Sequence, residues 1–490
     1  MELNELILQR KAKRKALEDA GITVFNKPYA SRLEIGAVLA NFQETKKVMV
    51  CGRVTAKRLH GKVIFADLRD STGKIQLYIK SDFVGADKFK LLDNIEVADF
   101  IGVAGELFKT HTQEPTVKVE DVIVLAKALR PLPEKWHGLK DVEARYRQRY
   151  LDLTANEEVK NVFISRSRII STVRVYLENR GFLEVETPMM HPIPGGAAGR
   201  PFKTHHNEYD MDLFLRIAPE LYLKRLLVGG LDRVFEINRS FRNEGVSIKH
   251  NPEFTMLEVY AAYADCETMM HLCESLVVNV CQEVFGTLTF TYQGKPMDLT
   301  PPWKRVSFAE LVREKFGIEP QDSEQTMLEK LQKAGFAKDK GTLSRTQINK
   351  VIEETLEKDM TTNPTFVTDY YTALCPLAKT KPGQPLISER FELFMAGMEV
   401  ANAYSELNDP EEQRRRFQEE IKDPGETGSK TVDEDYCLAL EHGMPPAGGL
   451  GIGIDRLVML LTDQASIRDV ILFPLLRLIE ESNKKIEGTQ

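Results

Sequence analysis

Five short segments between Lys46 and Leu125 alternate apolar and polar residues at every second position. A period of two is typical of β-strands that turn one face toward a core and the other toward water. The turn from Asp70 to Gly73 separates the second segment from the third. Five such strands favour a small closed β-barrel. The segments are VMVCGRV, KVIFADLRD, KIQLYIK, FIGVAGELF and TVKVEDVIVL.

A closed barrel of about five strands is the OB-fold pattern, whose open face binds single-stranded nucleic acid by base stacking and contacts to base edges. Phe65 lies in the second segment and Gln76 in the third, where an aromatic ring and an amide group can face one base. A strand phenylalanine is more often a core residue than a stacking platform. The two residues therefore indicate nucleic-acid binding only in combination with other features of the chain.

The length of 490 residues exceeds what one hydrophobic core can hold, so we expect two or three domains. A basic helix is expected in residues 1–30, and its charged face suits either solvent or nucleic-acid phosphates. The predicted divisions that follow are the barrel at 31–127, a proline-bearing linker at 128–144 and a larger domain at 145–490, with a mostly helical insertion at about 307–359.

Charge and cysteine content exclude some classes of protein. The net charge of −7 argues against a chain that coats nucleic acid without specificity. The six cysteines form no CxxC pair, which favours reduced thiols over a disulfide framework or a zinc site. No signal-type segment and no long apolar run is present, so we expect a cytoplasmic protein without a membrane partner.

The segment RSFRNEGVSIKHNPEFTMLE, from Arg239 to Glu258, places opposed charges beside an apolar alternating run. A turn at Gly245 between the two halves predicts an antiparallel hairpin. Arg242 on a rigid strand would suit a phosphate or carboxylate, because guanidinium binds these groups with two parallel hydrogen bonds. Phe254 offers a ring face for a purine. Taken alone, the segment also fits a hairpin with surface ion pairs.

Near the C-terminus, PAGGLGIGIDRLVMLL places glycines at every second position and then an arginine, Arg456. Glycines with this period suit a strand that a ligand or another backbone approaches closely. Arg456 would begin the following helix and direct a cation toward that strand. The Walker pattern and the Rossmann pattern are both absent from the sequence. The glycines concerned are Gly449, Gly451 and Gly453.

The segment RFELFMAGMEVANAYSELND contains Glu392, Glu399 and Glu406 at intervals of seven residues. That interval would place them on one face of a helix, but the apolar residues between them have a period of two, so strands are at least as well supported. Carboxylates that face nucleotide phosphates normally require a divalent cation between them, and Mg²⁺ is the common one.

These segments, in this order, resemble motifs two and three of the class II aminoacyl-tRNA synthetases, and GFLEVETPMM (181–190) resembles motif one. ARYRQRYLDL, RIAPELYLKRL, NAYSELNDP and GLGIGIDR are most similar to the lysyl-tRNA synthetases within that family. The resemblance covers nearly the whole chain. It implies an α+β protein, in which an N-terminal OB-fold barrel precedes a catalytic domain with an antiparallel sheet flanked by helices. It also implies a homodimer that associates through motif one.

The resemblance implies a ligase that activates L-lysine with ATP to lysyl-adenylate and pyrophosphate, and then transfers lysine to the 3′ end of tRNA(Lys). By the same resemblance, Arg242 and Arg456 are the catalytic residues, Arg242 on the α-phosphate and the lysine carboxylate and Arg456 on the γ-phosphate. The nucleotide would also contact Glu244 and His250, stack on Phe254 and use Mg²⁺ held by Glu392 and Glu399.

A lysine substrate carries two ammonium groups, so its pocket requires anionic partners at both ends. The resemblance implies that Glu220 holds the α-amine, with Gly196 packed beside it. The remaining lysine-binding residues implied are Arg242, Glu258, Tyr260, Asn402, Tyr404, Glu406 and Gly453, of which Glu258, Tyr260 and Glu406 would close on the ε-amine.

In the barrel, the resemblance implies that Phe65 stacks on the central anticodon uridine, with Gln76 and Glu114 at its edges. The sequence around Glu114 reads TQEP, where the family pattern has a glycine before the glutamate and no proline after it. This departure makes Glu114 the weakest of the three assignments.

Three alternatives remain open from the sequence. An aspartyl- or asparaginyl-tRNA synthetase would share the motifs but would need cations or neutral donors where this chain has acids. A lysine ligase acting on a protein acceptor, similar to the elongation factor P lysyltransferase, would lack the barrel. A non-catalytic nucleic-acid-binding module would not require the downstream glutamates, arginines and glycines to coincide.

Overall fold

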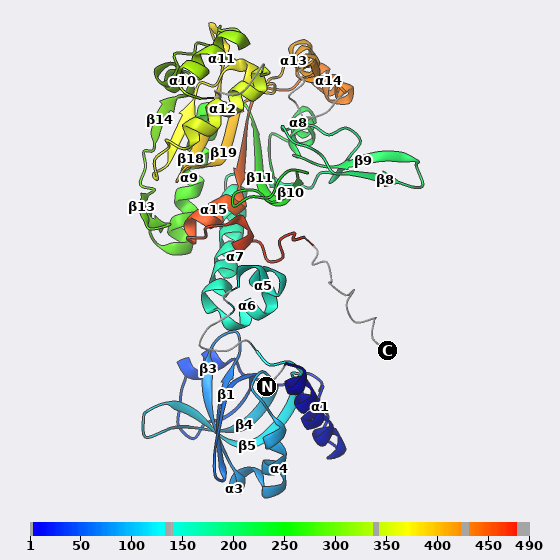
Figure 1. Ribbon diagram of the computed structural model, residues 1–490, viewed down its shortest axis with the longest axis vertical. Helices are drawn as coiled ribbons and strands as arrows, with labels where there is room; N and C mark the ends of the chain where they lie inside the picture. The colour runs from blue at the N-terminus through cyan, green and yellow to red at the C-terminus, as the bar shows by residue number, and fades with distance from the viewer. Residues whose placement is uncertain (1–2, 133–138, 140, 337–342, 423–430, 478–490) are drawn as a thin grey trace, which may run out of the picture. The chain divides into compact units, whose positions relative to one another are not determined.

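The computed structural model describes residues 3–132, 139, 141–336, 343–422 and 431–477. The chain divides into two compact units, Met1–Lys140 and Asp141–Gln490 (Figure 1). Much of the predicted linker, namely 133–138 and 140, lies outside the described residues. Across the described part of the chain, no helix combines the length and the apolar character that a membrane crossing requires.

The first unit contains a closed barrel with the strand order β1-β2-β3-β5-β4, which confirms the predicted barrel. Alternate residues of each strand are buried in its apolar centre, as the period of two requires. The strands are β1 (Lys47–His60), β2 (Val63–Arg69), β3 (Lys74–Lys80), β4 (Phe100–Lys109) and β5 (Pro115–Ala126). The helices are α1 (Leu3–Asp19), α2 (Ile35–Ala40), α3 (Ser81–Val84) and α4 (Ala86–Leu91).

The basic N-terminal helix α1 is fastened to the barrel by part of its charge cluster. The Arg10 guanidinium donates hydrogen bonds to the carbonyls of Val97 and Ala128, at 3.1 and 3.2 Å. Arg10 and Lys13 also form ion pairs with Glu96, at 3.3 and 2.6 Å. The sequence left open whether the charge cluster faces solvent or phosphate. Arg10 and Lys13 instead bind mainly to other residues of the same unit.

The second unit is built on an eight-stranded sheet with the order β14-β15-β18-β19-β20-β11-β10-β6. The strands from β15 to β10 are antiparallel, as predicted, whereas β14 and β6 pair parallel at the two edges. The strands are β6 (Leu183–Glu184), β10 (Arg233–Phe241), β11 (Glu253–Ala262), β14 (Lys304–Ser307), β15 (Thr365–Thr368), β18 (Arg390–Met395), β19 (Met398–Ser405) and β20 (Ala447–Gly453).

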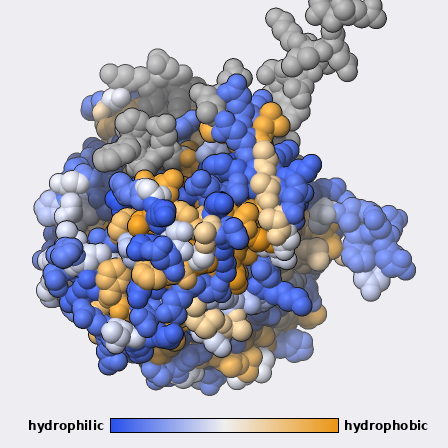
Figure 2. Space-filling model, turned by 90° about the horizontal axis from the view of Figure 1, so that it is seen from below, coloured by the Kyte–Doolittle hydropathy of each residue, from blue (hydrophilic) through white to orange (hydrophobic). Residues whose placement is uncertain are grey.

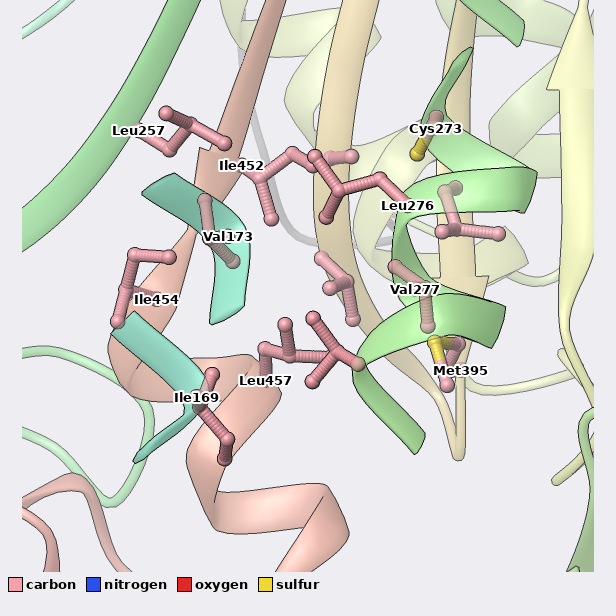
Figure 3. Close-up of a cluster of buried hydrophobic side chains, with 14 of the residues drawn as sticks. Ile169, Val173, Leu257, Cys273, Leu276, Val277, Met395, Ile452, Ile454 and Leu457 are labelled. Atoms are coloured by element: carbon pink, nitrogen blue, oxygen red, sulfur yellow. The ribbon is translucent and has the colours of Figure 1, made fainter. Parts of the chain in front are cut away.

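Helices α7, α9 and α15 pack against this sheet and form its main apolar core (Figure 3). In Figure 3, side chains of α7 and α9, such as Val173 and Leu276, lie close to Ile452 of β20 and Leu457 of α15. Fully burying one such side chain stabilises the fold by roughly 1.5–3 kcal/mol. The helices of the unit outside residues 307–359 are α5 (Val142–Arg147), α6 (Arg149–Ala155), α7 (Glu157–Glu178), α8 (Glu220–Val228), α9 (Cys266–Phe285), α13 (Pro410–Lys422), α14 (Glu434–Glu441) and α15 (Ile454–Leu461).

The described residues of 307–359 form three helices (Figure 1). Their buried apolar side chains share a separate core with strand β15. These helices are α10 (Phe308–Phe316), α11 (Glu324–Lys333) and α12 (Arg345–Glu357). Three small sheets complete the unit, made of β7 (Met190–His191), β8 (Lys203–His206) and β9 (Met211–Leu215); β12 (Thr289–Tyr292) and β13 (Lys295–Asp298); and β16 (Thr380–Lys381) and β17 (Gln384–Ser388). On the face shown in Figure 2, small apolar areas are scattered among hydrophilic ones.

The motif-one segment forms only a short strand in the structure. Only Leu183 and Glu184 pair with β10, and the Val185 amide adds one hydrogen bond to the Phe235 carbonyl. The Thr187 side chain then turns inward and donates a hydrogen bond to Glu236, at 2.7 Å. The chain leaves the sheet there because Pro188 has no amide hydrogen to continue the ladder.

Candidate functional site

Strand β20 runs between β11 and β19, and its register brings the predicted substrate-binding side chains together. Gly449 lies opposite Tyr260 on one side and Tyr404 on the other. Gly451 in turn lies opposite Glu258 and Asn402. Because alternate residues of a strand share one face, these four flanking side chains lie on the same side of the sheet.

The glycines of β20 leave room that neighbouring side chains fill. A Cβ atom added to Gly449 would lie 1.9 Å from Oε1 of Glu406 and 2.6 Å from the Tyr260 ring. A Cβ atom at Gly451 would lie 3.3 Å from Glu258, whereas one at Gly453 would meet nothing closer than 3.6 Å. Other groups therefore approach this strand closely, as predicted. At Gly449 these groups are side chains of the protein itself.

Glu220 closes the pocket from helix α8. It occupies the first turn of the helix, and its carboxylate accepts a hydrogen bond from the Tyr404 hydroxyl. Gly196 lies beside Glu220, as the resemblance implied. Its φ is +85°, and a Cβ atom added to Gly196 would lie 3.1 Å from the Cβ atom of Glu220. This left-handed conformation favours glycine at position 196.

Lys224 is a pocket residue that we did not predict. Its ammonium group lies 2.6 Å from Oε1 of Glu220 and forms a second ion pair with Glu406. Lys224 and Glu406 are both fully buried. The signal available in the sequence was the interval of four residues between Glu220 and Lys224, which places both on one face of a helix.

Glu258 is a buried acid whose charge is disfavoured in the pocket without substrate. Burial raises the pKa of Glu258 to about 8, and the nearby Glu220 carboxylate adds to the rise. The hydroxyl of Tyr260 donates a hydrogen bond to Oε2 of Glu258 at 3.1 Å, which lowers that pKa in part. A cation placed beside Glu258 would stabilise its ionised form.

Arg242 follows the end of β10 and lies beside the acid-lined pocket. Its amide donates a hydrogen bond to the Pro252 carbonyl at 2.9 Å, which closes the hairpin. Its guanidinium carbon lies 5.1 Å from the centre of the Phe254 ring. The buried Nε of Arg242 has no hydrogen-bond partner among the described residues. An unpaired guanidinium nitrogen on an aromatic face suits an incoming phosphate or carboxylate.

Arg456 is held in place by its neighbour Asp455. The Asp455 carboxylate accepts the Thr255 amide at 2.6 Å and forms an ion pair with Arg166 at 2.6 Å. From this anchor, Arg456 donates to the Glu399 carbonyl at 2.5 Å and approaches the Glu399 carboxylate at 3.2 Å. Arg456 also lies 3.2 Å from Nε2 of His250.

The predicted nucleotide contacts Glu244 and His250 are exposed in the loop that joins β10 to β11. His250 is hydrogen-bonded to the Ser247 hydroxyl at 2.9 Å and to Arg456. Burial lowers the pKa of His250 below its usual value, and Arg456 lowers it further. The neutral ring is therefore favoured near pH 7.

Glu392 and Glu399 lie on β18 and β19, near each other and near Arg456. Burial raises the pKa of Glu392 to about 8; Arg390 opposes the rise and Glu399 increases it. Glu392 accepts a hydrogen bond from Tyr370 at 2.7 Å and pairs with Arg390. Two repelling carboxylates supply the oxygen ligands that Mg²⁺ prefers when phosphates complete its coordination, so these residues fit the ion.

Asn402 points into the same region from β19. Its side-chain oxygen accepts a hydrogen bond from Nε of Arg390 at 3.1 Å. The amide nitrogen of Asn402 is the group that can donate to a substrate carboxylate.

The three predicted anticodon residues lie on, or directly before, the adjacent strands β2, β3 and β5 of the barrel. Phe65 on β2 is half-buried, and its ring lies 5.3 Å from that of Tyr78 on β3. Gln76 pairs in register with Thr116 of β5, whose hydroxyl donates to Oε1 of Gln76 at 3.1 Å. Glu114 comes directly before β5.

The turn before Glu114 accounts for the unusual TQEP sequence. Gln113 has φ of +63°, the left-handed conformation in which the family pattern places glycine. The amide of Gln113 donates to the Thr110 carbonyl at 2.8 Å, and the amide of Thr110 donates to the Glu114 carbonyl at 3.2 Å. The backbone shape that glycine favours is thus kept without glycine.

Comparisons with known proteins agree with this arrangement. The family model described as tRNA synthetases class II (D, K and N) matches residues 141–477, and that of the OB-fold nucleic acid binding domain matches 48–125. The chain is 53% identical over 483 residues to the lysine–tRNA ligase of Carboxydothermus hydrogenoformans, covering 97% of this chain and 99% of that protein. It is 52% identical over 488 residues to the lysine–tRNA ligase of Moorella thermoacetica, covering 98% and 99%.

The family model covers well over half of the chain, and the two relatives match 97% and 98% of it. The fold class predicted from the sequence and its resemblance to the class II enzymes are confirmed. The chain belongs to the class II tRNA synthetases of the D, K and N group and, within that group, to the lysine–tRNA ligase family.

Proposed function

We propose that this chain is a lysine–tRNA ligase that activates L-lysine with ATP, releases pyrophosphate and transfers lysine to the 3′ end of tRNA(Lys). The observation that carries the proposal is a pocket with three buried acids, which adjoins an arginine that has an unpaired nitrogen. Three acids suit a substrate with two ammonium groups far better than aspartate or asparagine. The acids are Glu220, Glu258 and Glu406, and the arginine is Arg242.

Adenylate formation needs no general base, because the attacking carboxylate is already ionised at pH 7. The protein contributes alignment and charge neutralisation. Arg242 would hold the lysine carboxylate against the α-phosphate, with Asn402 donating to the same carboxylate. Glu220 and Gly196 would line the α-amine end, while Glu258, Tyr260, Tyr404, Glu406 and Gly453 would complete the pocket.

The phosphates of ATP would extend toward Arg456, which Asp455 fixes in position. Mg²⁺, held by Glu392 and Glu399, would neutralise charge on the phosphates. Glu244 and His250 would contact the nucleotide, and Phe254 would stack on adenine. The exposed position of the loop that carries Glu244 and His250 supports access by a nucleotide.

The barrel would read the anticodon of tRNA(Lys) through Phe65, Gln76 and Glu114. Its presence favours a tRNA acceptor over the protein acceptor of the alternative ligase. We further propose that the reaction takes place in the cytoplasm, where translation consumes the product.

We also propose a homodimer formed through the motif-one segment. Exposed apolar side chains lie on α7 and on the segment from β6 to β7, where an isolated chain would leave them in water. A molar mass of twice 55.7 kDa by light scattering would support this, and a monomer at micromolar concentration would contradict it. The side chains are Ile164, Val175, Leu183, Met189 and Met190.

The decisive experiment is ATP–pyrophosphate exchange with Mg²⁺, in which each of the twenty amino acids is supplied separately. We expect exchange with lysine alone, and a loss of at least a hundredfold in Arg242→Ala, because one preorganised donor to the transition state is commonly worth that much. Arg239→Ala, on the strand β10 that Arg242 follows, is the matched control, since Arg239 is partly exposed and pairs only loosely with Glu253, at 3.8 Å.

Exchange with aspartate or asparagine would contradict the pocket assignment, and exchange with no amino acid would contradict the enzymatic function. Charging of tRNA(Lys) by the active protein then separates a tRNA acceptor from a protein acceptor.

A further inference from the structure

Lys224 occupies an unusual position, because it is a fully buried cation in a pocket proposed to bind a dication. Its ammonium contacts Glu220 at 2.6 Å and Glu406 through a second ion pair. The proposed function assigns these two acids to opposite ends of lysine, Glu220 to the α-amine and Glu406 to the ε-amine. One side chain of the protein therefore bridges the two carboxylates that would grip the substrate.

The bridge stays charged in its surroundings. Burial acts to lower the pKa of Lys224, but the carboxylates of Glu220 and Glu406 outweigh burial and hold that pKa above its ordinary value. Glu258, Tyr260, Tyr404 and Tyr436 are the other titratable groups around these acids.

Glu406 has capacity left for a ligand. It is fully buried, and its Oε2 is paired with the Lys224 ammonium. Within the described part of the chain its Oε1 has no hydrogen-bond partner, so the ion pair with Lys224 is its main anchor. Gly449 closes the space behind it. Glu220 has additional support from the Tyr404 hydroxyl. The position of Glu406 relative to Glu220 thus depends on Lys224.

Charge balance agrees with this arrangement. The pocket has three carboxylates, on Glu220, Glu258 and Glu406, and one resident ammonium on Lys224. A bound lysine adds two ammonium groups, while its carboxylate faces Arg242. Three negative charges are then paired with three positive charges. Such pairing offsets the desolvation free energy of burying them together.

We propose that Lys224 is a positioning residue that fixes the spacing between Glu220 and Glu406 and thereby sets the length of the diamino acid that the pocket accepts. The inference rests on the proposed function, since it concerns the same pocket. The feature by which Lys224 would select substrates is the distance between their two ammonium groups.

The test compares lysine with ornithine, which is one methylene shorter, in ATP–pyrophosphate exchange. One methylene is worth roughly 10–200-fold in kcat/KM, and we expect the wild type to favour lysine within that range. In Lys224→Met we expect this preference to fall at least tenfold, through a rise in the KM for lysine with kcat changed less than threefold. A purely structural role would weaken both substrates alike and leave their ratio unchanged.

Arg225→Met is the matched control, because Arg225 follows Lys224 on α8 but pairs with Asp433 and Asp435. We expect it to keep the wild-type ratio. Lys224→Met leaves two buried acids without their cation and can fail to fold, so Lys224→Arg is the second variant. It retains the charge on a longer side chain and should shift the preference at least threefold toward homolysine, which is one methylene longer.

A wild-type ratio of lysine to ornithine in a folded Lys224→Met protein would overturn the inference. If that variant does not fold, a wild-type ratio of lysine to homolysine in Lys224→Arg would overturn it. Wild-type protein that fails to activate lysine would instead overturn the proposed function, so the two failures are distinguishable.

Discussion

The raised pKa of Glu258 makes the stability of the folded protein depend on pH. Its folded pKa of about 8 lies well above the ordinary value of 4.5. Between these two values the folded state binds more protons than the unfolded state, so the stability that this group contributes is fully present below pH 4.5 and is lost as pH rises through about 8. The slope from one such group is at most about 1.4 kcal/mol per pH unit.

We therefore expect the thermal midpoint of the protein without substrate to fall between pH 6 and pH 8, and to fall less steeply in Glu258→Gln. Saturating lysine should restore much of the loss, because an ammonium group beside Glu258 favours its ionised form. Thermal unfolding in a pH series, with and without lysine, measures both effects. An identical pH dependence in wild type and Glu258→Gln would contradict the role of this carboxyl.

The sequence indicated which residue types gather in the pocket but not how they pair. The acids at 220, 258 and 406 were predicted from the resemblance to the lysyl-tRNA synthetases, which agrees with the need of a lysine substrate for anions at both of its ends. Lys224 was missed, since a lysine followed by Arg225 in a short helix normally faces solvent. Burial of a cation depends on distant partners, here Glu406, and no local pattern contains that information.

At the scale of single elements, strand β20 shows how an absent side chain shapes a pocket. A Cβ at Gly449 would overlap Oε1 of Glu406, whereas at Gly451 the nearest atom would lie at 3.3 Å. We expect Gly449→Ala to raise the KM for lysine at least tenfold by displacing Glu406, and Gly451→Ala to have a clearly smaller effect. Steady-state pyrophosphate exchange measures both. Equal effects at the two positions would contradict the steric explanation.

Strand periodicity predicted the barrel and the β10–β11 hairpin, because each depends on neighbouring segments. For the segment that forms β18 and β19, the sequence left a helix and strands both open. The parallel edges of the sheet were not predicted. Strand β14 pairs with β15 across the three helices of residues 307–359, and β6 pairs with β10 across about fifty residues. Such pairing is set by packing in three dimensions, so the alternation of residues within a strand cannot reveal it.

At the scale of the whole molecule, the two compact units predict a separation of activities. Phe65→Ala in the barrel should raise the KM for tRNA(Lys) by about 5- to 150-fold, since stacking of one base on an aromatic ring is worth about 1–3 kcal/mol. Lysine-dependent pyrophosphate exchange should be unchanged, because the pocket residues all lie in the second unit. Aminoacylation and exchange assays on the same preparation provide the comparison.

Phe100→Ala is the control for this prediction, because Phe100 is a partly exposed aromatic residue on β4 that stacks with Arg53. It should leave both assays unchanged. A loss of exchange activity in Phe65→Ala would contradict the separation.

The anchor of Arg456 has a further consequence for communication between subunits. Asp455, which fixes Arg456, is itself paired with Arg166 in the middle of α7. The same helix displays Ile164 and Val175 at the surface proposed to meet a second copy. In the proposed homodimer, α7 would contact both the partner and the anchor of Arg456, the residue proposed to bind the γ-phosphate. Occupancy of one nucleotide site would then alter the affinity of the other, and the dimer would respond to ATP cooperatively rather than as two independent sites.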